Sequence, residues 1–360
     1  MGKPRRFVCS AGKPDGVARP GETGYGHRAD ARARDAAAPH AENRKTSLRT
    51  YSAAEVNAAL DYPRLVEALR EAFRQGGEAM PVRQSYEVGV PGAPAHLLTM
   101  PAWQRGKTLG VKLVTVFPQN AAKGIGAVSS LYMLFDGETG VPLATIDGEA
   151  LTNRRTAAAS ALASSYLSRP DAKVLLMIGT GHLAAHLPAA HAAVRPIEKV
   201  LVWGRQLARA TDLAEKLREQ GIAATPVNDI AAGMTQADIV SCATTSTEPL
   251  VLGRTLRPGT HVDLVGAFTP QMRESDDDAV AGSRVYVDTY TGTKAEAGDL
   301  LQPIASGRWS ADCICADLHE LTSGAKAGRR DASEITLFKS VGAAIEDLTA
   351  AALVHAGGAG

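Results

Sequence analysis

The sequence predicts an α/β protein, with a helix-covered parallel sheet in its second half and an α+β domain before it. From residue 171 on, apolar runs such as AKVLLMIG, KVLVWGR, DIVSCATT and HVDLVGA alternate with amphipathic helical stretches, an order typical of a doubly wound parallel sheet. Between residues 81 and 148, short apolar or alternating runs are separated by turn residues and indicate hairpin-connected strands. An Ala-rich helical stretch at 151–167 joins the two parts.

The domain boundaries follow from helix signals. Pro63 opens an early helix, and Pro170 ends the Ala-rich one, because the residue before a proline disfavours helical backbone. We therefore expect residues 47–168 to form the α+β domain, completed by the C-terminal segment 325–360. Residues 169–324 should form the parallel-sheet domain. The last segment has apolar residues at helical spacing, which suits a helix that packs back across the boundary.

Length and charge suit a globular protein of two domains. The chain has 360 residues, of which 45% are hydrophobic and 21% charged, and a net charge of +1. Residues 1–46 hold ten Lys/Arg against five Asp/Glu and show no periodicity, so we expect a disordered N-terminal extension. The remainder has a net charge of −4, which gives no electrostatic reason to expect a nucleic-acid partner.

Other function classes are disfavoured by specific absences. No run reaches the ~18–20 apolar residues of a membrane span, and the N-terminus lacks the apolar segment of a signal peptide. Cys9, Cys242, Cys313 and Cys315 are irregularly spaced and form no CxxC pair. The acidic run 276–278 is expected at a helix start, where carboxylates favour the helix dipole. We expect a cytoplasmic protein with no metal and no membrane partner.

A glycine-rich loop follows the first strand of the second half. Its residues are Gly179, Thr180, Gly181, His182, Leu183 and Ala184. They fit the GxGxxA form of the dinucleotide fingerprint in a strand-to-helix context, which predicts a Rossmann-type domain. Gly179 allows the tight turn, Gly181 lets the backbone approach a pyrophosphate, and Ala184 keeps the helix close to the sheet. Pro188 should kink or shorten the helix that follows.

The end of the next strand indicates which cofactor is preferred. Proteins of this fold that bind NAD carry an acidic residue there, which accepts hydrogen bonds from the ribose hydroxyls. Here the strand ends in Trp203 and continues with Gly204, Arg205 and Gln206, without an acid. A guanidinium can pair with a 2′-phosphate, so we expect NADPH, with NADH as a weaker cofactor. A merely solvated Arg205 is the alternative.

Further motifs occur in one order along residues 48–355. They are MPVRQ at 80–84, GVKLVTVFPQN at 110–120, FDGETGVPLATIDG at 135–148, LTNRRTAAASALA at 151–163, GDLLQPI at 298–304 and ITLFKSVGAAIEDL at 335–348. Together with the glycine-rich loop, they resemble the ornithine cyclodeaminase and mu-crystallin family, which contains cyclodeaminases, cyclic-imine and ketimine reductases and some alanine dehydrogenases. The resemblance implies a homodimer in which the α+β domain is the substrate-binding and dimerisation domain.

The resemblance also implies roles for individual residues. Arg83, Lys112 and Arg155 match the cations that hold a substrate carboxylate, a task suited to guanidinium forks and a lysine point charge. Without the family, Lys112 in its apolar run would more simply point outward from a half-exposed strand. Arg155 and Thr156 match a helix-start pair that touches the cofactor phosphates, whereas Arg154 is expected to be solvated.

Four more residues are expected on the nicotinamide side of the cofactor. Ser340 matches a family residue near the nicotinamide. Ala243, Thr244 and Val265 follow two of the expected parallel strands, and sheets of this kind bind ligands at the carboxyl ends of their strands.

One segment favours reduction over deamination. In ornithine cyclodeaminases the stretch that matches residues 265–274 carries an aspartate for the substrate amine and then a lysine, but this chain has Phe268 and Met272 there. A phenyl ring cannot accept a proton. The resemblance therefore implies an NADPH-dependent reductase of Δ1-piperideine-2-carboxylate and/or Δ1-pyrroline-2-carboxylate, which forms L-pipecolate or L-proline. Lys112 is the candidate catalytic residue, because it can influence imine protonation.

Other functions stay open at this point. An ornithine cyclodeaminase would release ammonia from ornithine, and an alanine-dehydrogenase-like enzyme would make NADH from alanine. A non-enzymatic NADPH-binding protein, like some crystallin relatives, would have little use for Arg83, Lys112 and Arg155 together. Both ring sizes also stay open, because one methylene of pocket space changes binding by only ~1–3 kcal/mol.

Overall fold

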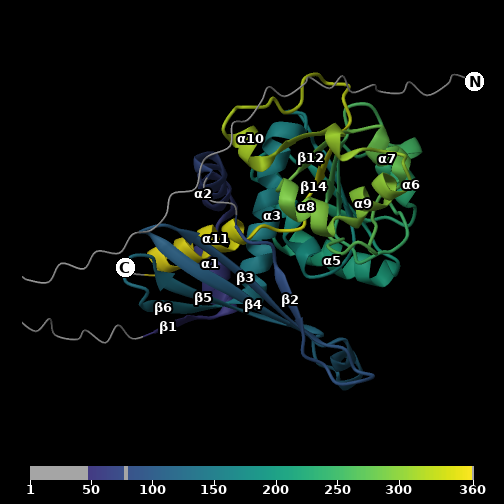
Figure 1. Ribbon diagram of the computed structural model, residues 1–360. Helices are drawn as coiled ribbons and strands as arrows, with labels where there is room; N and C mark the ends of the chain where they lie inside the picture. Colours follow the sequence, from purple (N-terminus) through teal and green to yellow (C-terminus); the bar gives the residue numbers. More distant parts are fainter. Residues whose placement is uncertain (1–47, 77–79, 359–360) are drawn as a thin grey trace, which may run out of the picture. The chain divides into compact units, whose positions relative to one another are not determined.

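The computed structural model describes residues 48–76 and 80–358. The expected N-terminal extension, 1–46, lies outside the described residues. The described chain forms a six-stranded sheet in its first part and an eight-stranded parallel sheet in its second part, both with helices packed against them (Figure 1). This arrangement confirms the predicted α/β class with a Rossmann-type sheet.

The six-stranded sheet is built mainly from hairpins. Its order is β1-β6-β5-β4-β3-β2; β2 to β6 pair antiparallel, and β1 pairs parallel with β6. The strands are β1 Arg49–Tyr51, β2 Gln84–Glu87, β3 His96–Gln104, β4 Thr108–Val116, β5 Val128–Asp136 and β6 Pro142–Asp147. A short 3-10 helix, η1 Pro118–Lys123, follows β4.

The two faces of this sheet differ in what covers them. Met100, Lys112 and Tyr132 form a cross-strand row, and all three are buried on the face against which the helices pack. The opposite face is also apolar, but Leu109 and Leu131 stay 36% and 40% exposed there. A solvent-facing side of an antiparallel sheet normally carries polar residues, so this apolar face indicates a contact surface.

Helices from both ends of the chain pack over the buried face. They are α1 Ala53–Ala59, α2 Tyr62–Gln75, α3 Gly148–Leu167 and α11 Ala344–Gly357. Helix α1 begins at Ser52 with a capping box, and α2 begins at Asp61 with Pro63 in its first turn, as capping rules predict. Helix α11 lies against β3, β4 and β5, while α2 packs on α3 and α11.

All neighbouring strands of the second sheet are parallel, in the order β13-β12-β14-β11-β10-β7-β8-β9. The strand order reverses between β7 and β10, which makes that place the topological switch point where such sheets bind ligands. The strands are β7 Val174–Ile178, β8 Lys199–Trp203, β9 Ala224–Pro226, β10 Ile239–Cys242, β11 His261–Leu264, β12 Arg284–Val287, β13 Ile314–Asp317 and β14 Thr336–Lys339.

Short helices connect these strands. They are α4 Leu187–Ala192, α5 Leu207–Glu219, α6 Ile230–Met234, α7 Asp277–Ala281, α8 Tyr290–Glu296, α9 Gly298–Ala305 and α10 Leu318–Thr322, with 3-10 turns η2 Leu183–Ala185, η3 Gly253–Thr255 and η4 Ala311–Cys313. No described helix is long and apolar enough to cross a membrane; the cytoplasmic location stays a prediction.

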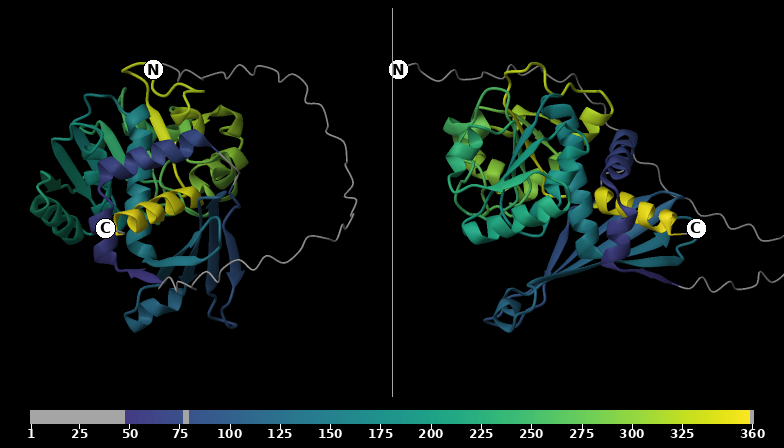
Figure 2. Two further views of the ribbon diagram at one scale, coloured as in Figure 1. Left: turned by 90° about the vertical axis from the view of Figure 1, so that its left-hand side faces the viewer. Right: turned by 180° about the vertical axis from the view of Figure 1, so that it is seen from behind.

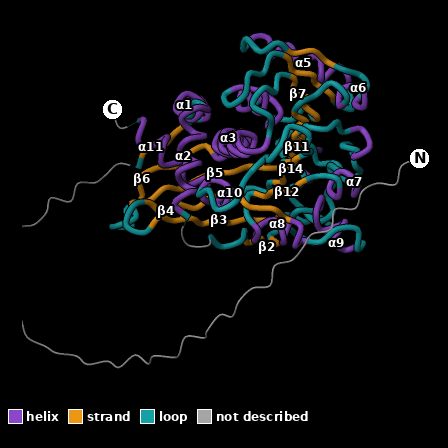
Figure 3. Tube along the Cα trace, turned by 90° about the horizontal axis from the view of Figure 1, so that it is seen from above, coloured by secondary structure: helices purple, strands orange, loops and turns teal. Residues whose placement is uncertain are grey.

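Helix α3 packs against both sheets. It contacts β4, β5 and β6 on one side and β11 and β14 on the other, and it stands between the parallel sheet and α11 in the right-hand view of Figure 2. The view from above in Figure 3 shows the same central position. Most of its residues are buried, because a helix enclosed on several sides needs small apolar side chains all round.

The C-terminal segment divides between the two sheets. Strand β14 pairs with β11 and β12 inside the parallel sheet, whereas α11 packs on the six-stranded sheet. The chain therefore returns to the first sheet after residue 339, later than the expected position 325. The reason is that the fully buried run TLFK completes the parallel ladder before the chain leaves it.

The helix after the glycine-rich loop is broken, as Pro188 predicts, but the break comes before the proline. The chain makes the 3-10 turn η2 and restarts as α4 at Leu187, with Pro188 in the first turn of the new helix. A proline is tolerated there because first-turn N–H groups have no partner within the helix.

Candidate active site

The residues that follow β7, β10, β11 and β14 lie in one hydrogen-bonded row. Each donates its backbone N–H to the carbonyl oxygen of the last residue of the neighbouring strand, at 2.9–3.1 Å; the four are Gly179, Ala243, Val265 and Ser340. The row crosses the switch point between β7 and β10, where open parallel sheets bind ligands. The structure thus brings together four residues that the sequence assigned to the cofactor.

The turn after β7 has the shape that a bound dinucleotide requires. Gly179 has φ 116°, and a Cβ at this position would lie 2.5 Å from the carbonyl oxygen of Ala243, so only glycine fits. Gly181 has no atom within 4 Å of the corresponding position, and it is exposed. Ala184 is fully buried, which brings the following turn close to the sheet. A pyrophosphate can therefore reach the backbone at Gly181.

The glycine-rich loop is tied to the start of α3. The exposed ring of His182 pairs with Glu149 in the first turn of α3. Thr180 and Leu183 are half-buried on either side of His182. Glu149 had no role in the sequence-based hypothesis, and an exposed acid at a helix start gives no signal of such a contact.

The place expected to recognise the cofactor ribose lies at the end of β8. A Cβ at Gly204 would lie 2.6 Å from Cγ2 of Thr180, so this turn packs directly on the glycine-rich loop. Arg205 and Gln206 follow and are exposed. The residue after Gly204 is therefore basic and not acidic, and Gly204 itself packs on the loop that would hold the phosphates.

Lys112 is a buried charge. It lies on β4, is 3% exposed, and its Nζ is 2.8 Å from Oδ2 and 3.0 Å from Oδ1 of Asp347 on α11. The outward orientation that its apolar run allowed is wrong. Burial and the Arg155 cation together lower the pKa of Lys112 to about 8, although Asp347 opposes the shift.

Arg155 shares the same aspartate. Its Nε lies 2.9 Å from Oδ1 of Asp347, and its Nη1 lies 2.7 Å from Oε2 of Glu346. Burial raises the pKa of Glu346 to about 7, against the attraction of Arg155. Thr156, next on α3, is buried as well. One carboxylate thus joins two cations that come from different elements, β4 and α3.

Arg83 reaches the same region from the segment before β2. Its Nη2 donates to the carbonyl oxygen of Val341 at 2.9 Å and lies 3.1 Å from Oε2 of Glu296. A Cβ on Gly342, which has φ 87°, would lie 2.6 Å from Nη1 of Arg155. The loop after β14 therefore touches both arginines and connects them to Ser340 in the row of strand ends.

Arg154 is not solvated as expected. Its Nε donates to Oδ1 of Asn57 at 2.9 Å, and its guanidinium lies 4.9 Å from the centre of the Tyr62 ring. The reason is that α1 and α2 cover this side of α3, which periodicity within α3 alone does not reveal.

Buried carboxylates were missed by the sequence-based hypothesis. Asp347 and Glu346 anchor the cations, and Oδ2 of Asp288 accepts hydrogen bonds from Ser340 Oγ, Val341 N and Gly342 N at 2.7–3.0 Å. A signal was present, because two acids interrupt the apolar spacing of the last helix. Phe268, three residues after Val265, is 39% exposed.

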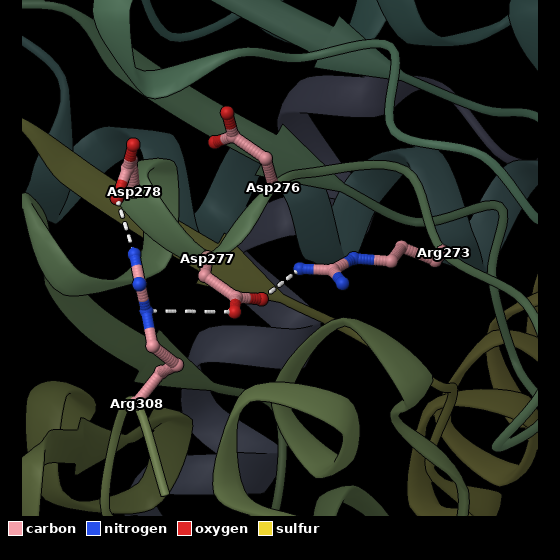
Figure 4. Close-up of a pocket in the computed structure, with 5 residues that line it drawn as sticks. All are labelled: Arg273, Asp276, Asp277, Asp278 and Arg308. Carbon is pink, nitrogen blue, oxygen red and sulfur yellow. Dashed lines mark hydrogen bonds and ion pairs between the residues drawn. The ribbon is translucent and has the colours of Figure 1, made fainter. Parts of the chain in front are cut away.

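A pocket elsewhere is filled with ion pairs. It is lined by Arg273, Asp276, Asp277, Asp278 and Arg308, and Figure 4 shows Asp277 between the two arginines and Asp278 paired with Arg308. Asp276 caps α7 by accepting from Ala279 N at 2.8 Å, which agrees with the expected helix start. The described residues hold no group of three or more His, Cys, Asp or Glu suited to a metal ion.

A dinucleotide-binding loop at a switch point, next to buried cations, is typical of a nicotinamide-dependent oxidoreductase. The model of the ornithine cyclodeaminase/mu-crystallin family matches residues 44–357. The chain therefore belongs to this family.

Three similar proteins are informative. The chain is 39% identical to the Δ1-pyrroline-2-carboxylate reductase of Paracoccus denitrificans over 86% of this chain and 98% of that protein. The Thermococcus litoralis Δ1-pyrroline-2-carboxylate reductase, solved with NADH and L-proline, is 35% identical with a TM-score of 0.81, over 86% and 97% of the two chains. An archaeal alanine dehydrogenase dimer with bound NAD is 29% identical with a TM-score of 0.79, over 86% and 95%. The chain is accordingly an NAD(P)H-dependent oxidoreductase of the imine-reducing type.

Proposed function

We propose that the protein reduces cyclic imino acids, Δ1-pyrroline-2-carboxylate and/or Δ1-piperideine-2-carboxylate, to L-proline and L-pipecolate, with NADPH as the preferred cofactor. The observation that supports this most is the convergence of Arg83, Lys112 and Arg155 beside the row of strand ends. These cations suit a carboxylate, and the row suits a nicotinamide. The pyrroline-2-carboxylate reductases among the similar proteins point to the same reaction.

The charge balance of the site favours a zwitterionic substrate. Lys112 and Arg155 are already paired with Asp347 and Glu346, so with Glu346 ionised the buried centre carries no excess positive charge. A substrate with an unprotonated imine nitrogen would carry only its carboxylate charge. That negative charge would be uncompensated in a buried place, which is costly. A protonated iminium carboxylate adds no net charge, and its N–H can face Asp347. A dicarboxylic imine would need a further cation.

With such a substrate, the reaction needs little acid–base catalysis from the protein's residues. A bound reduced nicotinamide supplies a hydride, and the row of Gly179, Ala243, Val265 and Ser340 would hold the dinucleotide. Arg83 and Arg155 hold the substrate carboxylate, so that C2 faces the strand ends. The hydride adds to C2, and the C=N electron pair moves to the nitrogen that already carries a proton. The secondary amine forms with all atoms and charges balanced.

Lys112 and Asp347 set the protonation of the substrate. A lysine with a pKa of about 8 can exchange a proton with the imine near neutral pH, and Asp347 stabilises the iminium by its negative charge. Lys112 is therefore the proposed catalytic residue, and Asp347 joins it.

The preference for NADPH rests on Arg205. A basic side chain beside Gly204 and the glycine-rich loop suits a 2′-phosphate, and no acid stands there to accept the hydroxyls of an NADH ribose. The Thermococcus litoralis enzyme was solved with NADH, so NADH is expected to work as well, with a higher KM.

The experiment that tests the function follows the absorbance of NADPH and NADH with each cyclic imine as substrate. Turnover of at least one ring size, faster with NADPH, is expected, together with proline or pipecolate as product. Ornithine, alanine and a dicarboxylic imine serve as alternative substrates. Ammonia release from ornithine without cofactor consumption, or faster turnover of the dicarboxylic imine, would contradict the proposal.

We also propose that the protein is a homodimer whose subunits meet through the apolar face of the six-stranded sheet. Leu109 and Leu131 lie exposed on this face, between half-buried Val111, Leu113 and Met133. A second copy of the chain is the natural occupant, because the similar alanine dehydrogenase is a dimer and an apolar face on one copy matches the same face on another.

A further inference from the structure

We propose that Glu274 is a positioning residue that holds the wall of the nicotinamide subsite, by joining the loops after β10 and β11. Its Oε1 accepts hydrogen bonds from the N and Oγ1 of Thr244, at 2.7 and 3.0 Å. Its Oε2 accepts from the N of Gly266 and of Ala267, at 2.9 and 3.1 Å. The proposal rests on the nicotinamide-dependent reaction described above, and Glu274 itself touches neither cofactor nor substrate.

The geometry requires a carboxylate. Four donors point at one side chain, two at each oxygen, and only an ionised carboxyl group offers acceptors on both. Burial raises the pKa of Glu274 to about 7, while Lys339 and the hydrogen bond from Thr244 N oppose that shift and favour the ionised form. The glutamine amide would place an NH2 group against one of the two donor pairs. One loop would then lose its anchor while the other kept it.

The two loops that Glu274 joins are packed closely against each other. A Cβ on Gly266 would lie 2.1 Å from the N of Thr244 and 2.2 Å from its carbonyl oxygen. Ala243 in turn contacts Gly179 in the glycine-rich loop. A shift at Glu274 is therefore passed directly to the row of strand ends, where the nicotinamide would lie.

A buried network of Asp299 and Lys339 holds Glu274 in place. Its backbone N and that of Ser275 donate to Oδ1 of Asp299 at 2.7 and 2.8 Å. Lys339, at the end of β14, lies with its Nζ 3.0 Å from Oδ2 of Asp299 and 3.9 Å from Oε2 of Glu274. All of these groups are fully buried, so the Glu274 carboxyl group has one fixed position and shares the Lys339 cation with Asp299.

A matched control exists in the same sheet. Asp263 on β11 is also fully buried, and it accepts from Ser160 Oγ, Ser241 Oγ and His191 Nε2 at 2.7–3.2 Å. None of these donors belongs to the loops that Glu274 joins. Asp263→Asn therefore removes a comparable buried charge without releasing the wall.

The test compares Glu274→Gln with Asp263→Asn in the full-length protein. Both variants should lower Tm. Only Glu274→Gln should raise the Kd of NADPH and NADH, measured by cofactor fluorescence, and lower kcat by about tenfold, because small misplacement of reacting groups is costly. The emission of bound NADPH should change as well, and the KM of the imine should stay within about twofold.

Thr244→Val is the milder second variant, since it removes the Oγ1 hydrogen bonds to Glu274 and from Ser246 N but keeps the bond from Thr244 N to Glu274, and it should shift Kd in the same direction by less. Unchanged cofactor Kd, kcat and bound-cofactor emission in Glu274→Gln, or equal changes in Asp263→Asn, would overturn the proposal. If Glu274→Gln does not fold, an unchanged Kd in Thr244→Val overturns it. Cofactor titration needs no imine, so a wild type that binds NADPH but reduces neither ring would refute the proposed substrate alone.

Discussion

At the scale of single residues, Lys112 shows how a buried charge is held ready for chemistry. Its ammonium group is enclosed by β4, α3 and α11 and paired with Asp347. Burial and the neighbouring Arg155 lower its pKa, whereas Asp347 raises it and so favours the charged form. The same aspartate also fixes Arg155, which makes Asp347 the centre of the cation site.

The pKa of Lys112 predicts the pH dependence of the reaction. Because its pKa is lowered to about 8, the lysine is charged below that pH and neutral above it. We expect kcat/KM for the imine to fall roughly tenfold per pH unit above pH 8. The measurement is a pH profile of steady-state kinetics with NADPH held saturating.

Lys112→Arg is the control for this profile. A guanidinium stays charged throughout the accessible range, so the variant should be slower overall but keep a flat profile up to about pH 10. A fall above pH 8 that is identical in wild type and Lys112→Arg would assign the titration to another group, including the imine itself.

At the scale of elements, the connection from β8 to α5 carries the choice of cofactor. Gly204 packs on the glycine-rich loop, and α5 begins two residues after Arg205. The short connection fixes where the backbone of Arg205 lies beside that loop, so its charge is available where the proposed cofactor's ribose would be.

Arg205→Asp should reverse the preference. The carboxylate repels a 2′-phosphate and accepts hydrogen bonds from ribose hydroxyls, so we expect the KM of NADPH to rise by about two orders of magnitude. The KM of NADH should change much less. Lys216→Asp, on the exposed side of α5, makes the same change of charge farther along the helix and should affect both cofactors little. Equal effects of Arg205→Asp on the two cofactors would refute the assignment.

At the scale of the whole molecule, the described chain leaves one face of the six-stranded sheet apolar and open. A stable dimer buries about 800 Å² on each partner, and an apolar sheet face can supply such a contact. Lys112 lies on the opposite face of the same sheet, so association would stiffen the strand that carries it.

Leu131→Lys should convert the dimer to a monomer. Leu131 lies opposite Leu113 on the exposed face, and a lysine there would place like charges on both subunits near the interface. Light scattering coupled to gel filtration measures the mass. Leu207→Lys is the control, since Leu207 is also exposed, at 46%, but lies on α5. A dimer that survives Leu131→Lys with unchanged stability would place the interface elsewhere.

The sequence by itself determined the features that local chemistry encodes. The glycine-rich turn, the strand and helix alternation and the proline boundary are all visible in short windows, because backbone conformation at Gly179 or Pro170 depends on neighbouring residues. The family motifs added Arg83, Lys112 and Arg155 as candidates, and the structure brings these three together.

Only the tertiary structure decided how those charges are balanced. Asp347 lies 235 residues from Lys112 along the chain, and Glu274 gathers donors from two separate strand ends. No local pattern encodes which acid faces which cation, because that depends on α11 packing across β4 and α3. Burial is a property of the packed molecule, and it explains why Lys112 is buried, why Arg154 is covered and why the chain returns late after β14. The free-energy cost of leaving a buried charge unpaired then selects the partner of that charge.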